Sequence, residues 1–333
     1  MTSFAKLDPT APTRYGFYGR LTANFPSQVV ADTTEVCNLA CIHCTHPEFK
    51  KSDNYRARML APDLNAKMVD EVAAHGRDKT LYIRYSGNGE PLVHPHLFEM
   101  LAYAAKNSGT TVTLTTNGTL LNSARMEKLL ATGVNLVDIS LDAFTSETYA
   151  AIRVNGNLEV TRANVLNLIK AARTATVRPK VVVSFVEQPQ NRNEIADFEQ
   201  YWRDNGADYV VVRRLHTNAN STAKVVAQVA STATAEPRRP CLYPWERILL
   251  NPSGHLSFCP MDWVHGSDFT DYRTTTIKDT WQGEFYRQLR AAHLENNYSC
   301  HGFCGQCPDW KSTRWPEQGR SYADMVQEFK ALE

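Results

Sequence analysis

The chain of 333 residues is 43% hydrophobic and 21% charged, with a formal net charge of +1. These values are typical of a folded globular protein, and the near-neutral charge gives no electrostatic indication of binding to nucleic acid or to an anionic membrane. No apolar run approaches the roughly 20 residues that span a bilayer, and residues 1–28 lack an apolar signal-peptide core. We therefore expect a cytoplasmic protein without a membrane or nucleic-acid partner.

Six strand–helix units are expected between residues 29 and 216, after an N-terminal extension of residues 1–28. Short β-branched runs alternate there with longer amphipathic segments. Such units imply parallel strands with right-handed crossovers, which fit either a partial (β/α)6 barrel or a doubly wound sheet. The predicted strands are Val29–Val36, Thr80–Ser86, Thr111–Thr116, Asn135–Leu141, Lys180–Glu187 and Asp208–Arg214. The predicted helices are Pro62–Ala74, His96–Asn107, Ser123–Thr132, Ser146–Arg153 with Thr161–Thr174, and Asn193–Asn205.

The periodic pattern stops after the sixth unit. Residues 217–240 are rich in Ala, Thr, Ser and Asn and are expected to form a linker. Beyond the linker, Glu246–Leu250 and His255–Cys259 flank an Asn-Pro-Ser-Gly turn and predict a β-hairpin. Thr276–Leu294 is predicted to be one helix, and residues 313–333 are expected to form a C-terminal helix centred on Tyr322–Leu332.

All eight cysteines fall into two groups, with none between residues 44 and 241. Cysteines that serve as small core residues would be scattered, so the clustering favours ligation or disulfides. Disulfides are the weaker option in a chain without a secretion signal, so we expect metal or iron–sulfur ligation. The first group is Cys37, Cys41 and Cys44; the second is Cys241, Cys259, Cys300, Cys304 and Cys307.

The first group forms a CX3CX2C motif directly after the first predicted strand. Three thiolates can bind three irons of a 4Fe–4S cubane and leave the fourth iron open to a small molecule. A zinc site with His43 or His46 as the fourth ligand is the alternative.

This motif resembles the signature of the radical S-adenosylmethionine (SAM) superfamily. The resemblance implies a partial (β/α)6 TIM barrel in which SAM binds the open iron through its amine and carboxylate and is cleaved to a 5′-deoxyadenosyl radical. Relatives usually carry an aromatic residue immediately before the third cysteine, where this chain has His43.

Further loops match the superfamily in order. Gly87-Asn88-Gly89-Glu90 follows the second strand and resembles the loop whose backbone and acidic side chain hold the SAM amino group. The other matching positions also follow successive strands, at the face where β/α barrels place their chemistry. The resemblance therefore implies SAM or cluster contacts from His43, Asn117, Ser140, Asp142 and Arg153 as well.

The second cysteine group resembles the SPASM/twitch extension of radical SAM enzymes, here spanning residues 241–312. Cys241, Gly254 and Cys259 form CX12GX4C across the predicted hairpin, and Cys304 and Cys307 add CX2C. Four thiolates suffice for one auxiliary 4Fe–4S cluster, with Cys300 as a spare thiol or replacement ligand. A four-cysteine zinc ribbon fits the spacing nearly as well on its own.

The resemblance favours an enzyme that abstracts hydrogen from a small molecule: a sugar, aminocyclitol or nucleoside of natural-product (antibiotic) biosynthesis. Only about 28 residues precede the first unit, so we expect no N-terminal peptide-recognition domain. The leading hypothesis is dehydrogenation, with an electron passing to the auxiliary cluster and flavodoxin or ferredoxin as reductant. The alternatives are epimerisation, decarboxylation or elimination; modification of a peptide or protein; or a zinc-binding protein without activity.

Candidate residues around the substrate rest on their position at the ends of the predicted strands. By alternation along the second strand, either Arg84 or Tyr85 points inward, but not both. The candidates for catalysis are Cys300, Glu187 and Asp262, and those for substrate contact are Arg213, Arg214, His216 and His46.

Overall fold

The computed structural model describes residues 23–218, 225, 238–262, 265–299 and 302–312. Cys300, the predicted C-terminal helix, most of the expected linker and residues 1–22 of the expected extension lie outside these residues. Within the described part, no helix is long and apolar enough to cross a membrane.

Six parallel strands form in the predicted order, which confirms the strand–helix pattern. The first strand ends four residues earlier than predicted, because the backbone after Asp32 turns to pair with a second segment, where Leu60 donates to the carbonyl of Thr33 and Glu35 to that of Arg58. The strands are β1 (Gln28–Asp32), β2 (Tyr82–Ser86), β3 (Thr111–Thr116), β4 (Leu136–Ser140), β5 (Lys180–Glu187) and β6 (Tyr209–Arg214).

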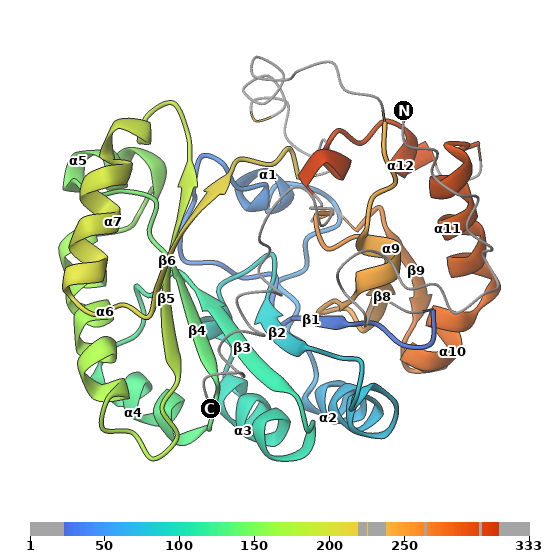
Figure 1. The fold of residues 1–333 in the computed structure, drawn as a ribbon, viewed down its shortest axis with the longest axis horizontal. Helices are drawn as coiled ribbons and strands as arrows, with labels where there is room; N and C mark the ends of the chain where they lie inside the picture. Colours follow the sequence, from blue (N-terminus) through green and yellow to red (C-terminus); the bar gives the residue numbers. More distant parts are fainter. Residues whose placement is uncertain (1–22, 219–224, 226–237, 263–264, 300–301, 313–333) are drawn as a thin grey trace.

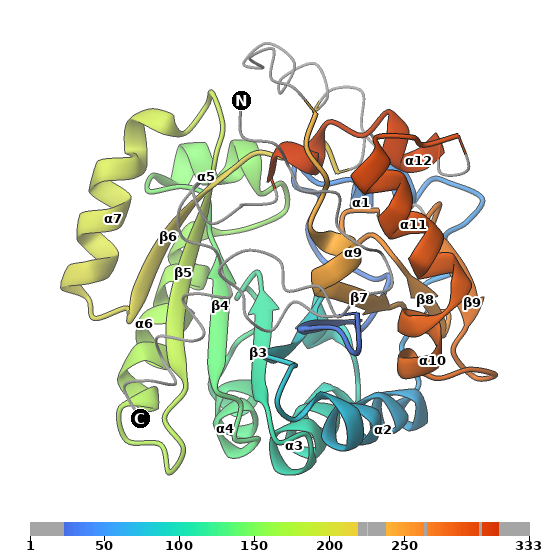
Figure 2. The same ribbon diagram turned by 45° about the vertical axis from the view of Figure 1, so that its right-hand side comes forward.

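The crossover helices cover one face of this sheet (Figures 1 and 2). They are α2 (Pro62–Glu71, continued by a π-helical turn at Val72–Gly76), α3 (Leu97–Asn107), α4 (Ser123–Ala131), α5 (Ser146–Ile152), α6 (Leu158–Ala172) and α7 (Ile195–Asp204). Strands β1 to β6 lie beside one another in sequence order, with no point at which the order reverses. A doubly wound sheet has such a reversal, so the partial TIM barrel is the architecture formed.

The two faces of the barrel sheet differ in chemistry. Apolar side chains such as Ile83 and Phe185 face the helices and form the core. The alternate residues on the same strands face inward, and many are polar. Tyr85 points outward and bonds Asn65 of α2 at 2.6 Å, so Arg84 is the inward residue of that pair. The inner face of the barrel is therefore a polar surface rather than a second core.

The C-terminal part continues the same sheet past β1. Strand β7 (Arg247–Leu250) pairs parallel to β1, and β8 (His255–Ser257) and β9 (Asp268–Asp271) follow antiparallel. The predicted hairpin is confirmed, whereas β9 was not predicted. The barrel and the C-terminal part therefore share one nine-stranded sheet with the order β6-β5-β4-β3-β2-β1-β7-β8-β9.

The single helix expected over Thr276–Leu294 is wrong. Gly283 has an extended backbone (φ −72°, ψ 172°) and separates α10 (Ile277–Gln282) from α11 (Glu284–Glu295). Glycine is a poor residue for a helix interior, and here it breaks the segment. The remaining short helical segments are α1 (His46–Phe49), Pro91–Val93, Arg192–Glu194, α9 (Tyr243–Glu246), α12 (Gly302–Gly305) and Asp309–Ser312.

Helix α2 ties the barrel to the C-terminal part. The Lys67 ammonium donates to the carbonyls of Tyr272 and Thr275, each at 2.6 Å. Glu71, one turn on, accepts from the Tyr272 hydroxyl at 2.6 Å and from the backbone of Ile277 at 2.7 Å. These bonds hold the start of α10 against the barrel.

The pairing of β1 with β7 predicts that a substitution in β7 destabilises the fold. Ile248 of β7 is fully buried opposite Val29. We expect Ile248→Ala to lower the free energy of unfolding by about 2 to 5 kcal/mol, because it removes buried methyl groups and leaves a cavity. Anaerobic guanidinium titration measures this change. Val160→Ala, at an exposed position of α6, is the control and is expected to change the free energy of unfolding by less than about 0.5 kcal/mol; equal effects would contradict the prediction.

Candidate active site

The first cysteine loop lies at the carboxyl end of β1. Cys44 donates its N–H to the carbonyl of Cys41, and backbone N–H groups point at two of the sulfurs: Leu39 at Cys37 (3.5 Å) and His46 at Cys44 (3.4 Å). Burial raises the pKa of the Cys37 thiol to about 12 and that of Cys41 to about 11. These thiols are thus protonated until a metal replaces the proton.

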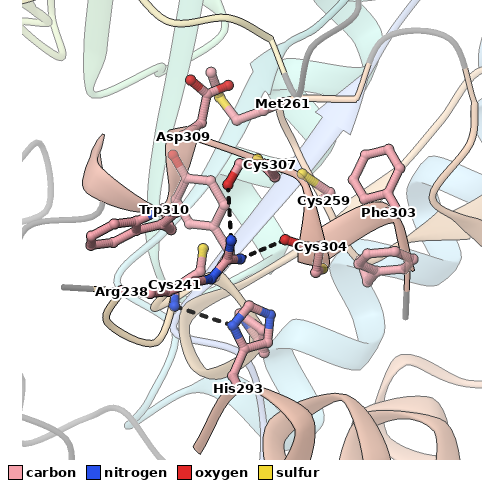
Figure 3. A pocket seen from close by; sticks show the side chains of 13 residues that line it. Arg238, Cys241, Cys259, Met261, His293, Phe303, Cys304, Cys307, Asp309 and Trp310 are labelled. Carbon is pink, nitrogen blue, oxygen red and sulfur yellow. Dashed lines mark hydrogen bonds between the residues drawn. The ribbon is translucent and has the colours of Figure 1, made fainter. Parts of the chain in front are cut away.

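The second cysteine set surrounds one pocket, shown in Figure 3. Cys241, Cys259, Cys304 and Cys307 all line it, and burial raises the pKa of each thiol. Among the residues that the structure describes, no three His, Cys, Asp or Glu side chains meet at a single-ion position. Four thiols around one pocket are the ligand set of a 4Fe–4S cubane, in which each thiolate binds a different iron.

Arg238 and His293 hold the walls of this pocket, and neither was predicted. The Arg238 guanidinium donates to the carbonyls of Cys304 (2.5 Å), Gly305 (3.0 Å) and Cys307 (3.3 Å). His293 Nδ1 accepts from the Cys241 N–H at 3.3 Å. These bonds fix three of the four cysteines. A lone arginine in a linker-like segment and a histidine on a helix gave no motif by which sequence could find them.

Asp142 connects the first cysteine loop to the barrel. Its carboxylate accepts from Arg153 at 2.5 Å and from the Val186 N–H at 2.7 Å, and lies 3.5 Å from His43 Nε2. Arg153 in turn points Nη1 at the sulfur of Cys41, 3.7 Å away. Burial opposes the charge of Arg153, but Asp142 beside it holds the pKa of Arg153 above its ordinary value. Asp142 and Arg153 thus bond to each other and to the cysteine loop, and their contacts with SAM stay a prediction.

His43 faces inward from the cysteine loop. Burial lowers its pKa to about 4, so the imidazole is neutral at pH 7. Gln188 donates to its Nδ1 at 3.3 Å, and its backbone carbonyl accepts from Asn218 at 3.3 Å. The loops after β5 and β6 therefore brace the residue that precedes Cys44.

The Gly87–Glu90 loop packs against the chain that leads to the cysteines. Gly87 has φ +144°, and a Cβ there would lie 1.9 Å from the Asp32 carboxylate. A Cβ on Gly89 would lie 2.3 Å from the carbonyl oxygen of Thr34. Only glycine fits either position, so the backbone of this loop forms a tight cradle beside the first cysteine loop, where a ligand can approach closely.

The Glu90 carboxylate braces the loops on either side of it. It is 2% exposed and accepts from the N–H groups of Leu92 (3.0 Å) and Asn117 (2.8 Å) and from the hydroxyl of Thr116 (2.5 Å). The Asn117 amide joins Asn38 of the cysteine loop at 3.0 Å. Glu90 and Asn117 thus link the loops after β2, β3 and β1, and the pairing of Glu90 with an ammonium group stays a prediction.

Asp32 is a site residue that the sequence did not indicate. It is buried at the end of β1, accepts from the Asn88 N–H at 3.1 Å, and its pKa is raised to about 8 by burial. Because the predicted strand runs to Val36, no sequence signal marked Asp32, five residues before Cys37, as a strand end.

Four of the predicted catalytic or substrate residues have side chains that point away from the inner face or bond to the backbone. Glu187 and Arg214 are register partners on the outer face of the sheet, where Glu187 lies 3.8 Å from Arg192, so the expectation that they face the site is wrong. Asp262 is buried and accepts from the Ser267 N–H, so it closes a loop instead of standing as a base. His46 is buried, with Nε2 donating to the carbonyl of Glu35 at 2.8 Å.

Other candidates keep places near the site. Ser140 is half-buried on the inner face at the end of β4, and His216 is half-buried just after β6. Thr217, the next residue, donates from its backbone and hydroxyl to Asp309 (2.8 and 2.9 Å), beside the auxiliary cysteines. The loop after β6 therefore joins the barrel to the second cysteine pocket. Cys300 lies outside the described residues.

Arg213 points inward, where it bonds residues from two other strands. Its Nη2 donates to Asp138 of β4 at 2.6 Å and to Ser184 of β5 at 3.0 Å. Arg84 of β2 approaches the same Asp138 oxygen at 3.6 Å and donates to Thr115 of β3 at 3.0 Å. The centre of the inner face is thus a network of two arginines around one carboxylate.

Known proteins share both the fold and parts of the sequence. The solved structures include BtrN in complex with AdoMet and 2-DOIA (TM-score 0.58, 13% identity, 88% of this chain and 97% of that one). They also include Streptococcus suis SuiB bound to precursor peptide SuiA (TM-score 0.64, 13% identity, 91% and 73%) and anSMEcpe with bound AdoMet (0.60, 14%, 92% and 91%). At these identities the likeness shows the fold alone.

Curated relatives match over the barrel region. AdoMet-dependent heme synthase of Methanosarcina barkeri is 36% identical over 149 residues, 44% of this chain and 40% of the relative. A probable GTP 3′,8-cyclase of Methanocaldococcus jannaschii is 33% identical over 52% of this chain and 54% of the relative, and the mycofactocin maturase MftC of Mycobacterium tuberculosis is 31% identical over 51% and 39%. The chain spans about half the length of these relatives.

Two family models match in series along the chain. The iron–sulfur cluster-binding SPASM domain matches residues 241–308, which include the four cysteines of the second pocket. The matches imply a SAM-binding 4Fe–4S cluster, SAM and auxiliary iron–sulfur ligation as the cofactors. Because the other model matches residues 32–201, half of the chain, the protein belongs to the radical SAM superfamily and carries a SPASM-type iron–sulfur domain after its barrel.

Proposed function

We propose that the protein is a dehydrogenase that abstracts hydrogen from a small molecule, a sugar, aminocyclitol or nucleoside of natural-product biosynthesis, in the cytoplasm. The observation that carries the proposal is the pocket of four cysteines joined to the loop after β6 through Thr217 and Asp309. An auxiliary cluster held in this pocket would lie beside the loop after β6, at the carboxyl ends of the barrel strands, where it could accept an electron.

We assign residues to the first cluster and to SAM. Cys37, Cys41 and Cys44 would hold the first cluster, and the Gly87–Gly89 backbone would face SAM beside it. When bound, these cofactors supply a 5′-deoxyadenosyl radical to the inner face of the barrel. The oxidation of a carbinol then balances if the carbon loses a hydrogen atom to that radical, the hydroxyl loses a proton to water or a base, and one electron passes to the auxiliary cluster.

The chain's own residues position the reaction. The Asp142–Arg153 pair fixes Cys41, and the neutral His43 and Gln188 fix the same loop from β5. The Glu90 carboxylate holds the loops after β2 and β3 in register with the cysteine loop. An electron donor, flavodoxin or ferredoxin, is part of the proposal.

A peptide or protein substrate is the second candidate. SuiB, bound to a precursor peptide, and the mycofactocin maturase are among the proteins similar to this one. BtrN, bound to AdoMet and 2-DOIA, supports the small-molecule proposal, and this chain aligns with 97% of BtrN against 73% of SuiB. Redox-neutral epimerisation, decarboxylation or elimination remains the alternative outcome on a small substrate.

Product analysis tests the proposed oxidation. We expect Cys304→Ala with Cys307→Ala to keep cleavage of SAM to 5′-deoxyadenosine but to lose more than 90% of a ketone product, because the electron acceptor is removed. Mass spectrometry of anaerobic reactions with sugar, aminocyclitol and nucleoside panels measures both. A product of unchanged oxidation level that carries solvent deuterium would overturn dehydrogenation, and turnover of peptides alone would favour the second candidate.

Metal content tests the two clusters. We expect about eight irons and eight sulfides per chain, falling to about four of each when Cys37, Cys41 and Cys44 are replaced by Ala, since each cubane holds four irons. Anaerobic purification followed by iron, sulfide and zinc analysis measures this. Zinc without iron after reconstitution would instead indicate a zinc-binding protein.

The glycine cradle predicts a local defect. In Gly87→Ala the new methyl group would overlap the Asp32 carboxylate, so we expect SAM affinity to fall at least tenfold while iron content is unchanged. Gly109→Ala is the matched control, because Gly109 also has a positive φ (+65°) but its nearest neighbour would be 3.7 Å away. Equilibrium binding of SAM to both anaerobic proteins measures the difference; equal affinities would rule out a cradle at Gly87.

A further inference from the structure

One arginine at the wall of the second cysteine pocket forms no ion pair with a described carboxylate. Arg238 Nε donates to the Tyr298 hydroxyl at 3.2 Å. Its Nη atoms donate to the carbonyls of Cys304, Gly305 and Cys307, and Figure 3 shows the guanidinium group among the labelled cysteines. All of these acceptors are neutral oxygens, and a guanidinium stays protonated inside proteins. Arg238 therefore brings a positive charge to the pocket.

The surroundings of this charge are largely apolar. The guanidinium lies over the ring of Tyr298, 4.4 Å from its centroid, and 6.0 Å from the centroid of Trp310. Trp310 lines the pocket together with Phe258 and Phe303. A charge among such groups is screened less than a charge at the protein surface. The charge of Arg238 therefore acts strongly on a group that the four cysteines hold.

Asp309 is the second charged side chain among the described residues that line the pocket. It is 5% exposed and accepts from the backbone and the hydroxyl of Thr217 at 2.8 and 2.9 Å. Arg238 and Asp309 thus place charges of opposite sign at one pocket. Their effects on a group held there oppose each other, so each can be tested against the other.

A 4Fe–4S cluster bound by four thiolates is negatively charged and becomes more so when it gains an electron. A cation beside the cluster stabilises the reduced form more than the oxidised form, and an anion does the reverse. The reduction potential of such a cluster therefore depends on the charges around it.

We propose that Arg238 raises the reduction potential of the auxiliary cluster and so suits this cluster to accept the electron of the oxidation. The inference rests on the proposed function and names the residue that makes the cluster an acceptor. The electron comes from the substrate radical, whose hydroxyl releases its proton as the carbon–oxygen double bond forms. The bonds from Arg238 to the carbonyls of Cys304 and Cys307 hold the guanidinium at a constant distance from the cluster.

A redox titration of the auxiliary cluster tests the inference. In the full chain with Cys37, Cys41 and Cys44 replaced by Ala, the electron paramagnetic resonance signal of the reduced protein comes from the auxiliary cluster alone. We expect Arg238→Gln to lower the equilibrium constant for reduction at least tenfold, which corresponds to about 59 mV for one electron. An iron content of about four per chain shows that each variant keeps its cluster.

Three further variants separate the charge of Arg238 from its role in holding the pocket wall. Arg239→Gln is the matched control, because Arg239 is the next residue and of the same type but does not line the pocket. Arg238→Lys keeps the charge and loses the fork of donors. Both are expected to keep the equilibrium constant for reduction within about threefold. Asp309→Asn removes the opposite charge and is expected to raise that constant at least threefold, which a loosened pocket would not explain.

The outcomes for the inference and for the proposed function are distinguishable, because the titration does not require turnover. Equal constants with and without Arg238→Gln, or an equal fall in Arg238→Lys, would overturn the inference. Product analysis of the holoenzyme reports on dehydrogenation separately. A constant that depends on the charge of Arg238, together with a product of unchanged oxidation level, would support the effect of Arg238 on the potential but overturn dehydrogenation. Zinc in place of iron in the pocket would overturn both.

Discussion

The handedness of the crossovers is the constraint on which this molecule depends. Parallel strands joined by right-handed connections and kept in sequence order bring all the helices to one face of the sheet. That face takes the apolar residues, and the inner face is left with polar groups such as Arg84 and Asp138. The handedness of the crossovers therefore determines where the core and the site lie. It also leaves an open edge at β1 that has to be covered.

The loops at the carboxyl ends of the strands act as one assembly. Each bonds to the cysteine loop or to a neighbour that does: Glu90 and Asn117 from β2 and β3, Asp142 from β4, Gln188 from β5 and Asn218 from β6. Several residues that resemble SAM ligands are engaged in this mutual bracing. A substitution at any of them would therefore disturb the cysteine loop.

Sequence could predict the features that repeat or that follow from metal chemistry. The six strands appear because β-branched runs recur between amphipathic segments, and the cysteine sets because their spacing serves ligation. The break at Gly283 and the short strand β9 depend on tertiary packing, which local pattern does not encode.

The direction of side chains at the strand ends could not be predicted from the sequence either. Arg213 and Arg214 are adjacent and of one type, and only the pairing register separates the inward residue from the outward one. Glu90 is an acid in a ligand-like loop, and its three donors come from Leu92, Thr116 and Asn117, two of which are about 26 residues away. Burial and long-range bonding of this kind become visible only in the folded chain.

The pairing of β1 with β7 also has a consequence for the nascent chain. Ser27, just before β1, donates to the carbonyl of Glu246, which is 219 residues away. At a ribosomal rate of about 5 to 20 residues per second, this partner is made about 10 to 40 seconds after β1. During that interval one edge of β1 is without its final neighbour, and unpaired strand edges invite pairing with other chains. The yield of soluble protein should therefore rise at a lower growth temperature and with chaperones that shield strand edges. These conditions should matter as much as the supply of iron.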